Sequence, residues 1–357
     1  MKIGYSFWGV LAKPELVAGT GTTEFAAVGE RHLLVDEFIR QGHTVIVLQK
    51  RREQNEYPGV VYTTDLYGIK TCDIVYMEWR WPMPGKNTGP NCPDDDLRRQ
   101  TEILMLCNEN AIPVVVFDTD KKMSYSDFVA WPCIVAVTEP CLNPDEWKHG
   151  LFWATDFDPL FSVSKSPTRN YIYLGNNYER LDQFSKYYGN PSAGLRYSHG
   201  VQTIAYGNWI EESPDRESPK EIIKNFPFVS FGGRKSYYEG MKAISESVCT
   251  TLLAKDEYYK SGFIASRVYE PILCGTPMLI PAEHKHLLSI GQTSQINTVV
   301  HSAQDVVDSI DSLSKMTTAQ RAGIVNEQFE KLRCIADFSP AAKVQQIIAY
   351  SKFKKFK

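Results

Sequence analysis

The feature that most constrains the fold of this chain is a repeated alternation of short apolar runs with stretches of helical periodicity. The first repeat has an apolar run at 2–7, a helical pattern at 29–41 that ends at Gly42, and a second apolar run at 44–48. Short runs rich in β-branched and aromatic residues are typical of buried strands, and a helix between two of them joins parallel neighbours. The chain is therefore expected to have an α/β fold with parallel sheets.

The same alternation continues along the chain and falls into two series. Further strands are expected at 74–77, 114–117, 134–137, 171–174, 203–206, 228–231, 250–253, 278–280 and 298–300. Further helices are expected at 98–110, 178–188, 237–247, 267–273, 303–314, 318–335 and 340–352. A segment with Pro159 and Pro167 separates the two series, and 357 residues are enough for two domains. We expect domains at 1–165 and 166–337, followed by a C-terminal helix and basic tail at 338–357.

The composition argues against several classes of protein. The formal net charge is -3, so binding to nucleic acid or to an acidic membrane would require a local basic patch. The 8 cysteines form no CxxC pair, which favours reduced core residues over disulfides or a zinc site. No uncharged apolar run reaches the roughly 18 residues of a membrane span. We therefore expect a cytoplasmic protein without a membrane partner.

A cation and a carboxylate lie three residues apart at Arg267 and Glu270, ahead of Gly275 and an apolar run. Residues at this spacing share one face of a helix. The planar fork of arginine can donate to two oxygens of a diphosphate, and a carboxylate can accept from both vicinal hydroxyls of a ribose. The pattern is common in the nucleotide-binding half of sugar-nucleotide transferases. A surface ion pair explains the two residues equally well, so both interpretations stay open.

Three glycine-containing turns follow expected strands of the second series. They are Leu174-Gly-Asn-Asn-Tyr178, Tyr206-Gly-Asn208 and Phe231-Gly-Gly-Arg-Lys235, and Arg180 follows the first of them. Backbone N–H groups in such turns can bind phosphate, and ligands of open α/β sheets lie beyond the carboxyl ends of the strands. Each turn alone is more typical of an ordinary loop. If their strands are neighbours, the three turns converge on one crevice with the charged pair.

Two carboxylates end an expected buried strand of the first series, in Val114-Val-Val-Phe-Asp-Thr-Asp120. Asp118 or Asp120 could act there as a general base toward an alcohol. The pair could instead be the metal-binding DxD of a different transferase fold, or one aspartate could cap the next segment. The histidines form no HExxH motif and the cysteines have no zinc spacing, so no metal site is expected.

Two further features of the sequence bear on substrates. Glu30 begins the first long helix, after a loop at 18–24 that lacks the full GxGxxG spacing and that we interpret as facing the substrate. The basic clusters Lys50-Arg-Arg52 and 352–357 would favour nucleic-acid phosphates. For the cluster at the end of the chain, a disordered, solubilising terminus is the simpler explanation.

Taken in order, these motifs resemble those of the DNA glucosyltransferases of T-even-type bacteriophages, which have the GT-B fold of two Rossmann-like domains facing across a cleft. The closest segment is Phe263-Ile-Ala-Ser-Arg-Val-Tyr-Glu270, and the three glycine turns follow the family's order and approximate spacing. In the first half, Glu30 matches the family's sugar-contacting acid and Asp120 its catalytic aspartate. The resemblance also implies that the last helix crosses back to the first domain.

The resemblance implies a UDP-sugar as the donor substrate. The residues it implies are Tyr206, Gly207 and Arg234 for uracil, Glu270 for ribose, and Gly175, Asn177, Arg180 and Arg267 for the diphosphate. Glu30 would orient the sugar, and Asp120 would take the proton from the acceptor hydroxyl as that hydroxyl attacks the anomeric carbon. The cations would stabilise the departing UDP, and the reaction would invert the anomeric centre. A divalent metal would at most aid the release of UDP.

The sequence thus predicts an enzyme that moves a sugar, glucose or a pentose such as arabinose, from a UDP-sugar to the hydroxyl of 5-hydroxymethylcytosine in double-stranded DNA. If the chain is phage-encoded, it would act in the host cytoplasm. One departure is that the family's first glycine turn carries two arginines, whereas here Phe184 occupies the region of the second. Two alternatives remain, a GT-B enzyme that acts on a lipid, protein or metabolite and a sugar-nucleotide- or DNA-binding module without turnover.

Overall fold

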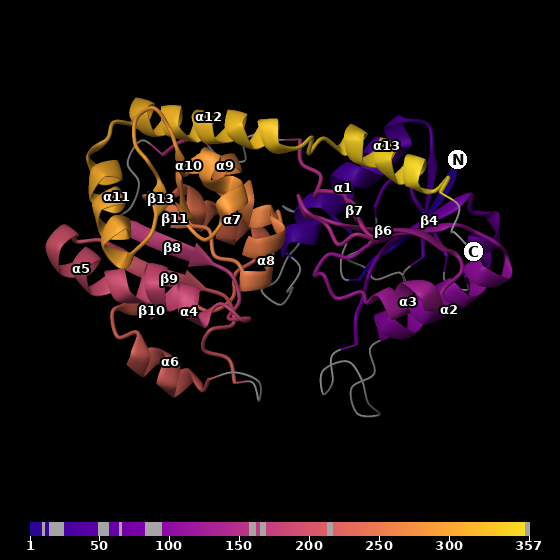
Figure 1. Cartoon of the computed structure of the whole chain (residues 1–357), viewed down its shortest axis with the longest axis horizontal. Coiled ribbons are helices and arrows are strands. Elements are labelled where there is room, and N and C mark those ends of the chain that lie inside the picture. Colours follow the sequence, from indigo (N-terminus) through magenta and orange to yellow (C-terminus); the bar gives the residue numbers. More distant parts are fainter. Residues whose placement is uncertain are drawn as a thin grey trace. The chain divides into compact units, whose positions relative to one another are not determined.

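The computed structural model describes residues 1–8, 11–13, 25–48, 57–63, 66–82, 95–156, 162–164, 169–212 and 217–353, drawn in colour in Figure 1. The chain divides into two compact units. Unit 1 contains Met1–Leu16, Ala26–Asp156 and Asp337–Lys357, and unit 2 contains Val17–Phe25 and Phe157–Ala336. The main boundary between the units therefore falls after Asp156, near the expected domain boundary. The C-terminal segment belongs to unit 1.

Unit 1 is built on a parallel sheet of seven strands in the order β3-β2-β1-β4-β5-β6-β7. The strands are β1 (Lys2–Ser6), β2 (Thr44–Val47), β3 (Val61–Tyr62), β4 (Ile74–Glu78), β5 (Val114–Phe117), β6 (Ile134–Glu139) and β7 (His149–Gly150). The chain first adds strands on one side of β1 and then on the other. This is the doubly wound arrangement, whose switch point lies between β1 and β4.

The helical segments of unit 1 are α1 (Phe25–Arg40), η3 (Tyr67–Thr71), α2 (Asp95–Glu109), α3 (Tyr125–Ala130) and α13 (Pro340–Tyr350). The last of these confirms that the C-terminal helix returns to the first unit. Tyr350 donates from its hydroxyl to the Gly150 carbonyl at 3.2 Å and stacks on His149 at 4.9 Å between ring centroids. Lys343 pairs with Glu30 of α1.

Unit 2 has two three-stranded parallel sheets that meet edge to edge. One contains β8 (Asn170–Leu174), β9 (Gln202–Tyr206) and β10 (Val229–Phe231), and the other β11 (Thr250–Thr251), β12 (Met278–Pro281) and β13 (Val299–Val300). A parallel bridge between Tyr171 and Cys249 and a 2.9 Å bond from Val248 N–H to the Asn170 carbonyl join β8 to β11. The combined order is β10-β9-β8-β11-β12-β13. Unit 2 is therefore also doubly wound, with its switch point between β8 and β11.

The helical segments of unit 2 differ in how well their bounds were predicted. They are α4 (Leu181–Phe184), the π-helix Ser185–Gly189, α5 (Asn190–His199), α6 (Pro219–Asn225), α7 (Tyr237–Ser245), α8 (Asp256–Ser261), η5 (Ser266–Val268), α9 (Glu270–Leu273), η6 (Lys285–Leu287), α10 (Leu288–Gly291), α11 (Ala303–Lys315) and α12 (Thr318–Ile335). The bounds of α12 match the prediction, because Thr317 and Gln320 form a capping box. The helix expected at 267–273 is instead split into η5 and α9. Pro271 has no N–H and its ring would clash with the carbonyl four residues earlier in a continuous α-helix.

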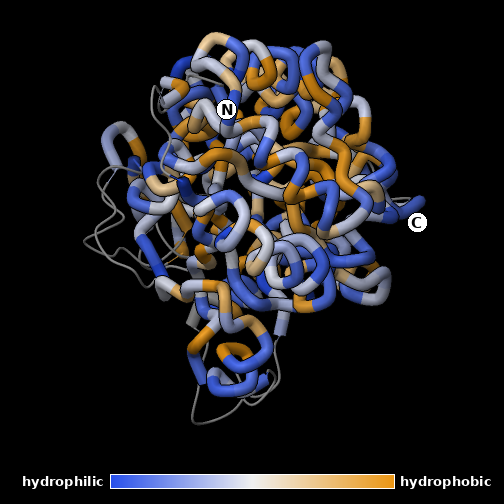
Figure 2. The backbone as a smooth tube through the Cα atoms, turned by 90° about the vertical axis from the view of Figure 1, so that its left-hand side faces the viewer, coloured by the Kyte–Doolittle hydropathy of each residue, from blue (hydrophilic) through white to orange (hydrophobic). Residues whose placement is uncertain are grey.

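The two units have separate hydrophobic cores, and Figure 2 shows the hydrophobic stretches of the backbone in orange. In unit 1, strands β4 and β5 pack through residues such as Met77 and Val116 on Ile103 of α2. The core of unit 2 is rich in aromatic rings. Phe184 lies 4.0 Å from Trp209 between ring centroids and both are almost completely buried. This core explains why no second charged side chain occupies position 184.

Candidate functional site

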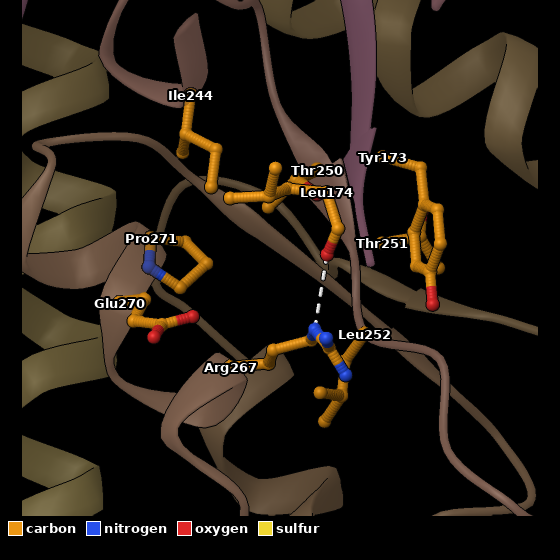
Figure 3. A pocket seen from close by; sticks show the side chains of 9 residues that line it. All are labelled: Tyr173, Leu174, Ile244, Thr250, Thr251, Leu252, Arg267, Glu270 and Pro271. Carbon is orange, nitrogen blue, oxygen red and sulfur yellow. Dashed lines mark hydrogen bonds between the residues drawn. The ribbon is translucent and has the colours of Figure 1, made fainter. Parts of the chain in front are cut away.

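A pocket lies at the switch point of unit 2, where a ligand is expected in a doubly wound sheet. The residues that line it come from the ends of β8 and β11, from α7 and from the segment before β12: Tyr173, Leu174, Ile244, Thr250, Thr251, Leu252, Arg267, Glu270 and Pro271. Arg267 and Glu270 are thus brought together as predicted, although two short helices carry them in place of one (Figure 3). The alternative of a surface ion pair does not fit, because Glu270 is only 4% exposed.

The three glycine turns interlock at the carboxyl ends of β8, β9 and β10. Gly175 donates its N–H to the Tyr206 carbonyl at 2.9 Å, and Gly207 donates to the Gly233 carbonyl at 2.8 Å. Gly207 has φ of +130°, and a Cβ there would lie 2.3 Å from the Gly175 carbonyl oxygen. No other residue fits so close an approach. The strands are therefore neighbours, which is the condition on which the predicted crevice depended.

Two asparagines fasten the first two turns to each other. Asn208 accepts at its side-chain oxygen from the Asn177 N–H at 2.9 Å, and Asn176 accepts from the Asn208 N–H at 3.2 Å. Trp209 donates from its indole to the Gly175 carbonyl at 2.7 Å. The main-chain N–H of Asn177 is therefore already bonded. A hydrogen bond that Asn177 donates to a diphosphate is therefore expected to come from its side chain.

Arg267 and Arg180 place two positive charges beside the first turn. Arg267 donates from Nε to the Leu174 carbonyl at 2.9 Å, and a Cβ on Gly175 would lie 2.9 Å from its Cζ. Arg180 donates to the Asn176 carbonyl at 3.3 Å, and its Nε is buried without a partner. Within the described residues neither guanidinium forms an ion pair with a carboxylate. Burial lowers the pKa of Arg267, and the charge of Arg180 acts in the same direction.

Glu270 contributes a buried carboxylate to the same pocket. Its Oε1 is buried and has no hydrogen-bond partner, although a lone buried oxygen of this kind is costly. Burial raises the pKa of Glu270, and the nearby Arg267 opposes that rise. The hydroxyl of Tyr173 is a further buried atom without a partner. Two cations without a salt-bridge partner among the described residues, an open carboxylate oxygen and a hydroxyl fit a ligand that carries both an anion and hydroxyl groups.

Tyr206 and Arg234 lie on the β9–β10 side of the glycine turns. The ring of Tyr206 would lie 2.2 Å from a Cβ on Gly232, and the Lys235 ammonium sits 4.7 Å from its centroid. Arg234 forms a two-pronged ion pair with Glu211, with both bonds at 2.5 Å. Its Nε and one terminal nitrogen are therefore already in use, and its uracil-binding role stays a prediction.

In unit 1 the two candidate bases follow β5 but have different surroundings. Asp118 is completely buried and accepts from the N–H groups of Lys122 and Met123, both at 2.9 Å, and from Lys148 at 3.0 Å. Asp120 is partly exposed, and Trp81 donates from its indole to Asp120 Oδ2 at 3.4 Å. Both carboxylates were identified from the sequence, but only that of Asp120 reaches the surface.

Glu30 lies inside unit 1. It is 1% exposed, accepts from the Ala154 N–H at 2.8 Å, and pairs with Lys343 of α13. The Lys343 ammonium also lies 3.9 Å from the centroid of the Phe117 ring. Burial raises the pKa of Glu30 and lowers that of Lys343, with each partner opposing the shift of the other. Both oxygens of Glu30 are in use, so its contact with a sugar stays a prediction.

Sequence reasoning missed several residues of these two regions. Tyr173 and Thr250 line the pocket only because β8 and β11 are neighbours, and no local sequence motif predicts that these two strands pair. Lys343 was missed because Glu30 lies 313 residues away, and Lys148 because Asp118 lies 30 residues away. The loop 18–24, the cluster Lys50-Arg-Arg52 and the end of the basic tail lie outside the described residues.

The described part of the chain shows no group of three His, Cys, Asp or Glu side chains placed to hold a metal ion. Over the same residues, no helix combines the length and the hydropathy that a membrane crossing requires.

Comparison with known proteins gives matches at the level of structure. No family model matches the chain, and no curated protein sequence does either. The DNA-modifying enzyme β-glucosyltransferase, solved with and without UDP-glucose, is 14% identical with a TM-score of 0.61 over 99% of both chains. T4 phage BGT with UDP and Mn²⁺ is 14% identical with a TM-score of 0.62 over 99% of both chains. HepE from Anabaena with UDP-glucose is 14% identical with a TM-score of 0.56 over 98% of both chains.

At this level of identity the likeness establishes the fold. The chain has the mixed α/β architecture with parallel sheets of the GT-B glycosyltransferases, as the sequence predicted.

Proposed function

We propose that the chain is a glycosyltransferase that uses a UDP-sugar as its donor. The observation that carries the proposal is the pocket at the β8–β11 switch point, where Arg267 forms no salt bridge with any described residue and Oε1 of Glu270 is buried without a hydrogen-bond partner. Arg180 adds a second positive charge beside the neighbouring glycine turn. A nucleoside diphosphate supplies the anion and a ribose supplies the hydroxyls that these groups need. The fold supports the proposal, because structures of the same fold are known with UDP and with UDP-glucose.

Within this proposal the donor contacts follow the geometry of unit 2. The carboxylate of Glu270 accepts from the ribose hydroxyls, and the guanidinium groups of Arg267 and Arg180 bind the diphosphate. Gly175 lets the diphosphate approach the first turn closely, and Asn177 binds it through its side-chain amide. Tyr206 and Gly207 hold uracil. Arg234 joins them when its guanidinium contacts uracil as well as Glu211. The cations also stabilise the charge that develops on the leaving UDP.

Asp120 is the proposed general base. It takes the proton from the acceptor hydroxyl while the hydroxyl oxygen attacks the anomeric carbon and the bond to UDP breaks, with inversion of that carbon. The partial exposure of Asp120 supports this role. Glu30 is proposed to act on the sugar side, as the resemblance implies. No step is assigned to a metal ion, and a divalent ion is proposed only as an aid to UDP release.

For the acceptor, we propose the hydroxymethyl group of 5-hydroxymethylcytosine in double-stranded DNA, bound by unit 1. Similarity to the DNA-modifying β-glucosyltransferase over 99% of the chain supports a DNA acceptor. HepE from Anabaena with UDP-glucose has the same identity over 98% of the chain, so the likeness of fold does not single out DNA. The second candidate is a GT-B enzyme with a lipid, protein or metabolite acceptor. The sugar is proposed to be glucose or arabinose.

The test is mass spectrometry of hydroxymethylated DNA after incubation with the protein and a panel of UDP-sugars. A gain of one hexose or one pentose per modified base is the expected result. Tight UDP binding without any mass gain would contradict the DNA acceptor while leaving the donor site intact. Failure to bind UDP, measured by calorimetry, would contradict the donor site itself.

A binding module without turnover is separated from an enzyme by a second measurement. An enzyme of this kind releases UDP slowly from its UDP-sugar even without acceptor, whereas a binder returns the donor unchanged. Retention on a DNA column that weakens steeply with salt supports a DNA acceptor, because phosphate contacts release counter-ions.

A further inference from the structure

The turn that carries Asp120 is folded around the carboxylate of Asp118. Asp118 ends β5 without any exposure to solvent. Its Oδ1 accepts from the Lys122 N–H and its Oδ2 from the Met123 N–H, both at 2.9 Å. The two donors lie four and five residues further along, so the backbone between them must loop back. Asp120 lies in that loop and is partly exposed.

A buried charge network holds Asp118 in turn. The Lys148 ammonium lies 3.0 Å from Asp118 Oδ2, 3.0 Å from Glu139 Oε2 and 3.1 Å from Asp145 Oδ2. The side chains of Lys148, Asp118 and Glu139 are at most 1% exposed, whereas that of Asp145 is 48% exposed. Removal of one member of such a buried pair leaves an uncompensated charge, so the network strongly resists rearrangement.

The same network holds a strained residue next to Asp120. Lys121 has φ of +53°, a left-handed conformation that non-glycine residues seldom adopt. Its ammonium is bound by Glu139 Oε1 at 2.7 Å and by Asp145 Oδ1 at 3.4 Å. Strain of this kind persists only where the surroundings over-determine it. Asp120 is therefore flanked on one side by the Asp118 bonds and on the other by the anchored Lys121.

We propose that Asp118 is a positioning residue that fixes Asp120 for its work as the base, with Lys148 and Glu139 as the buried support of Asp118. The inference rests on the proposed function and decides between the two aspartates. A general base must come within hydrogen-bond reach of the proton that it abstracts. Asp118 is sealed from solvent and both of its oxygens are occupied. Burial raises the pKa of Asp118, which would suit a base, but accessibility rules out direct contact with an acceptor.

The first test does not depend on activity. Amide hydrogen exchange of residues 119–124 should be at least about tenfold faster in Asp118→Asn than in the native chain, because an amide offers one acceptor where a carboxylate offers two. Asp120→Asn should leave the exchange of this segment unchanged. Unaltered exchange in Asp118→Asn would overturn the positioning role, whether or not the chain transfers sugar.

The second test measures turnover and UDP affinity in the same variants. Asp118→Asn should lower kcat about tenfold without changing the Kd for UDP, and should stay well above Asp120→Asn in activity. An Asp118→Asn variant that is as inactive as Asp120→Asn, with native exchange at 119–124, would make Asp118 the base. If the native chain transfers no sugar at all, the proposed function fails, and the exchange experiment still decides the positioning role.

A charge-matched double variant and a control variant distinguish loss of the buried charge pair from general misfolding. Lys148→Met alone leaves the Asp118 carboxylate buried without its cation, so it should impair folding and exchange more than Asp118→Asn/Lys148→Met, which removes both charges. A double variant no better than Lys148→Met would contradict the support role of the pair. Asp145→Asn removes the exposed member of the network and should change exchange and kcat less than twofold.

Discussion

The two units share one topology, yet the charged groups at their switch points are in opposite states. In unit 1, Glu78 at the end of β4 accepts two bonds from Arg31, at 2.9 and 2.6 Å, and a third from the Tyr5 hydroxyl at 2.6 Å. In unit 2, Arg267 and Glu270 line the switch-point pocket, where Oε1 of Glu270 has no hydrogen-bond partner and Arg267 forms no salt bridge with any described residue. A buried charge that is paired is compensated within the fold and is costly to leave alone, whereas a buried polar atom without a partner can be satisfied by a ligand.

This difference teaches how a ligand site can be recognised in a doubly wound sheet. Topology places both crevices at equivalent positions, so topology alone would predict two ligand sites. Because Glu78 is fully paired, the unit 1 switch point is a poor candidate for a ligand site. The open oxygen of Glu270 makes the unit 2 switch point the better candidate. Asp120 differs from the buried charges of unit 1, because its carboxylate is partly exposed.

The largest effect is expected for a substitution of Asp120. Asp120→Asn should lower the rate of sugar transfer by about 10²- to 10⁴-fold, the usual contribution of a positioned general base. The Kd for UDP should stay within about twofold, because Asp120 belongs to unit 1 and the proposed UDP contacts belong to unit 2. Steady-state kinetics and calorimetry on one preparation measure both quantities. Near-native turnover in this variant would remove Asp120 from catalysis.

A paired charge of unit 1 should matter for stability. Lys343→Met leaves Glu30 buried without its cation and should lower the free energy of unfolding by about 3–5 kcal/mol. Glu30→Gln/Lys343→Met should recover much of that loss. Denaturant unfolding measures both, and an undiminished loss in the double variant would show that packing, not charge, explains the effect.

This loss should also depend on pH with a definite sign. Burial raises the pKa of Glu30 above its ordinary value of 4.5, and Lys343 opposes the rise, so its removal raises that pKa further. Between the unfolded and folded values the native state then binds more protons than the unfolded state. Its stability falls as pH rises through that window. The deficit of Lys343→Met should therefore be small near pH 4.5 and grow toward neutral pH.

Substitution of Glu270, whose carboxylate in unit 2 has an open oxygen, should affect ligand binding and not stability. Glu270→Gln should weaken UDP binding about 10- to 100-fold, because the ribose loses a charged acceptor. Unlike Lys343→Met, this variant should unfold at no lower denaturant concentration than the native chain, since it removes a buried charge that has no full complement. Glu330→Gln, on the exposed face of α12, is the matched control and should change neither quantity. An unchanged UDP affinity in Glu270→Gln would take Glu270 out of the donor site.

The smallest effect concerns an arginine that is already paired. Arg234→Ala should weaken UDP binding by less than about threefold if its guanidinium stays on Glu211, since exposed pairs contribute little. Arg267→Ala should weaken the same binding by at least about tenfold, because it removes a partly buried charge that is open to an anion. Calorimetry on the two variants gives the ratio directly. Equal losses would mean that UDP draws Arg234 away from Glu211.

Much of the fold could be predicted from the sequence, because buried strands are short apolar runs between turn residues. The bounds of β5 and α12 match the predicted ranges. The predicted helix at 267–273 was wrong, although Pro271 already indicated a break. The order of the strands was not predictable, because β8 meets β11 through contacts between residues that lie far apart in sequence.

The candidate site was predictable only where its residues form local motifs. Arg267, Glu270 and the glycine turns lie in short segments that can be read directly, and the structure brings them together at one end of the unit 2 sheet. The Glu30–Lys343 pair joins residues 313 positions apart, and no spacing rule reaches that far. Whether a charge is paired or open depends on such contacts, so the sequence alone could not separate Asp118 from Asp120.

The return of α13 to unit 1 also fixes the order in which the two units can be completed during synthesis. Strands β1 to β7 leave the ribosome first, but Glu30 stays without its cation until Lys343 has emerged, after all of unit 2. The second unit can therefore finish its core before the first. A truncation meant only to trim a terminal helix would instead leave a buried carboxylate uncompensated in the unit at the opposite end of the sequence.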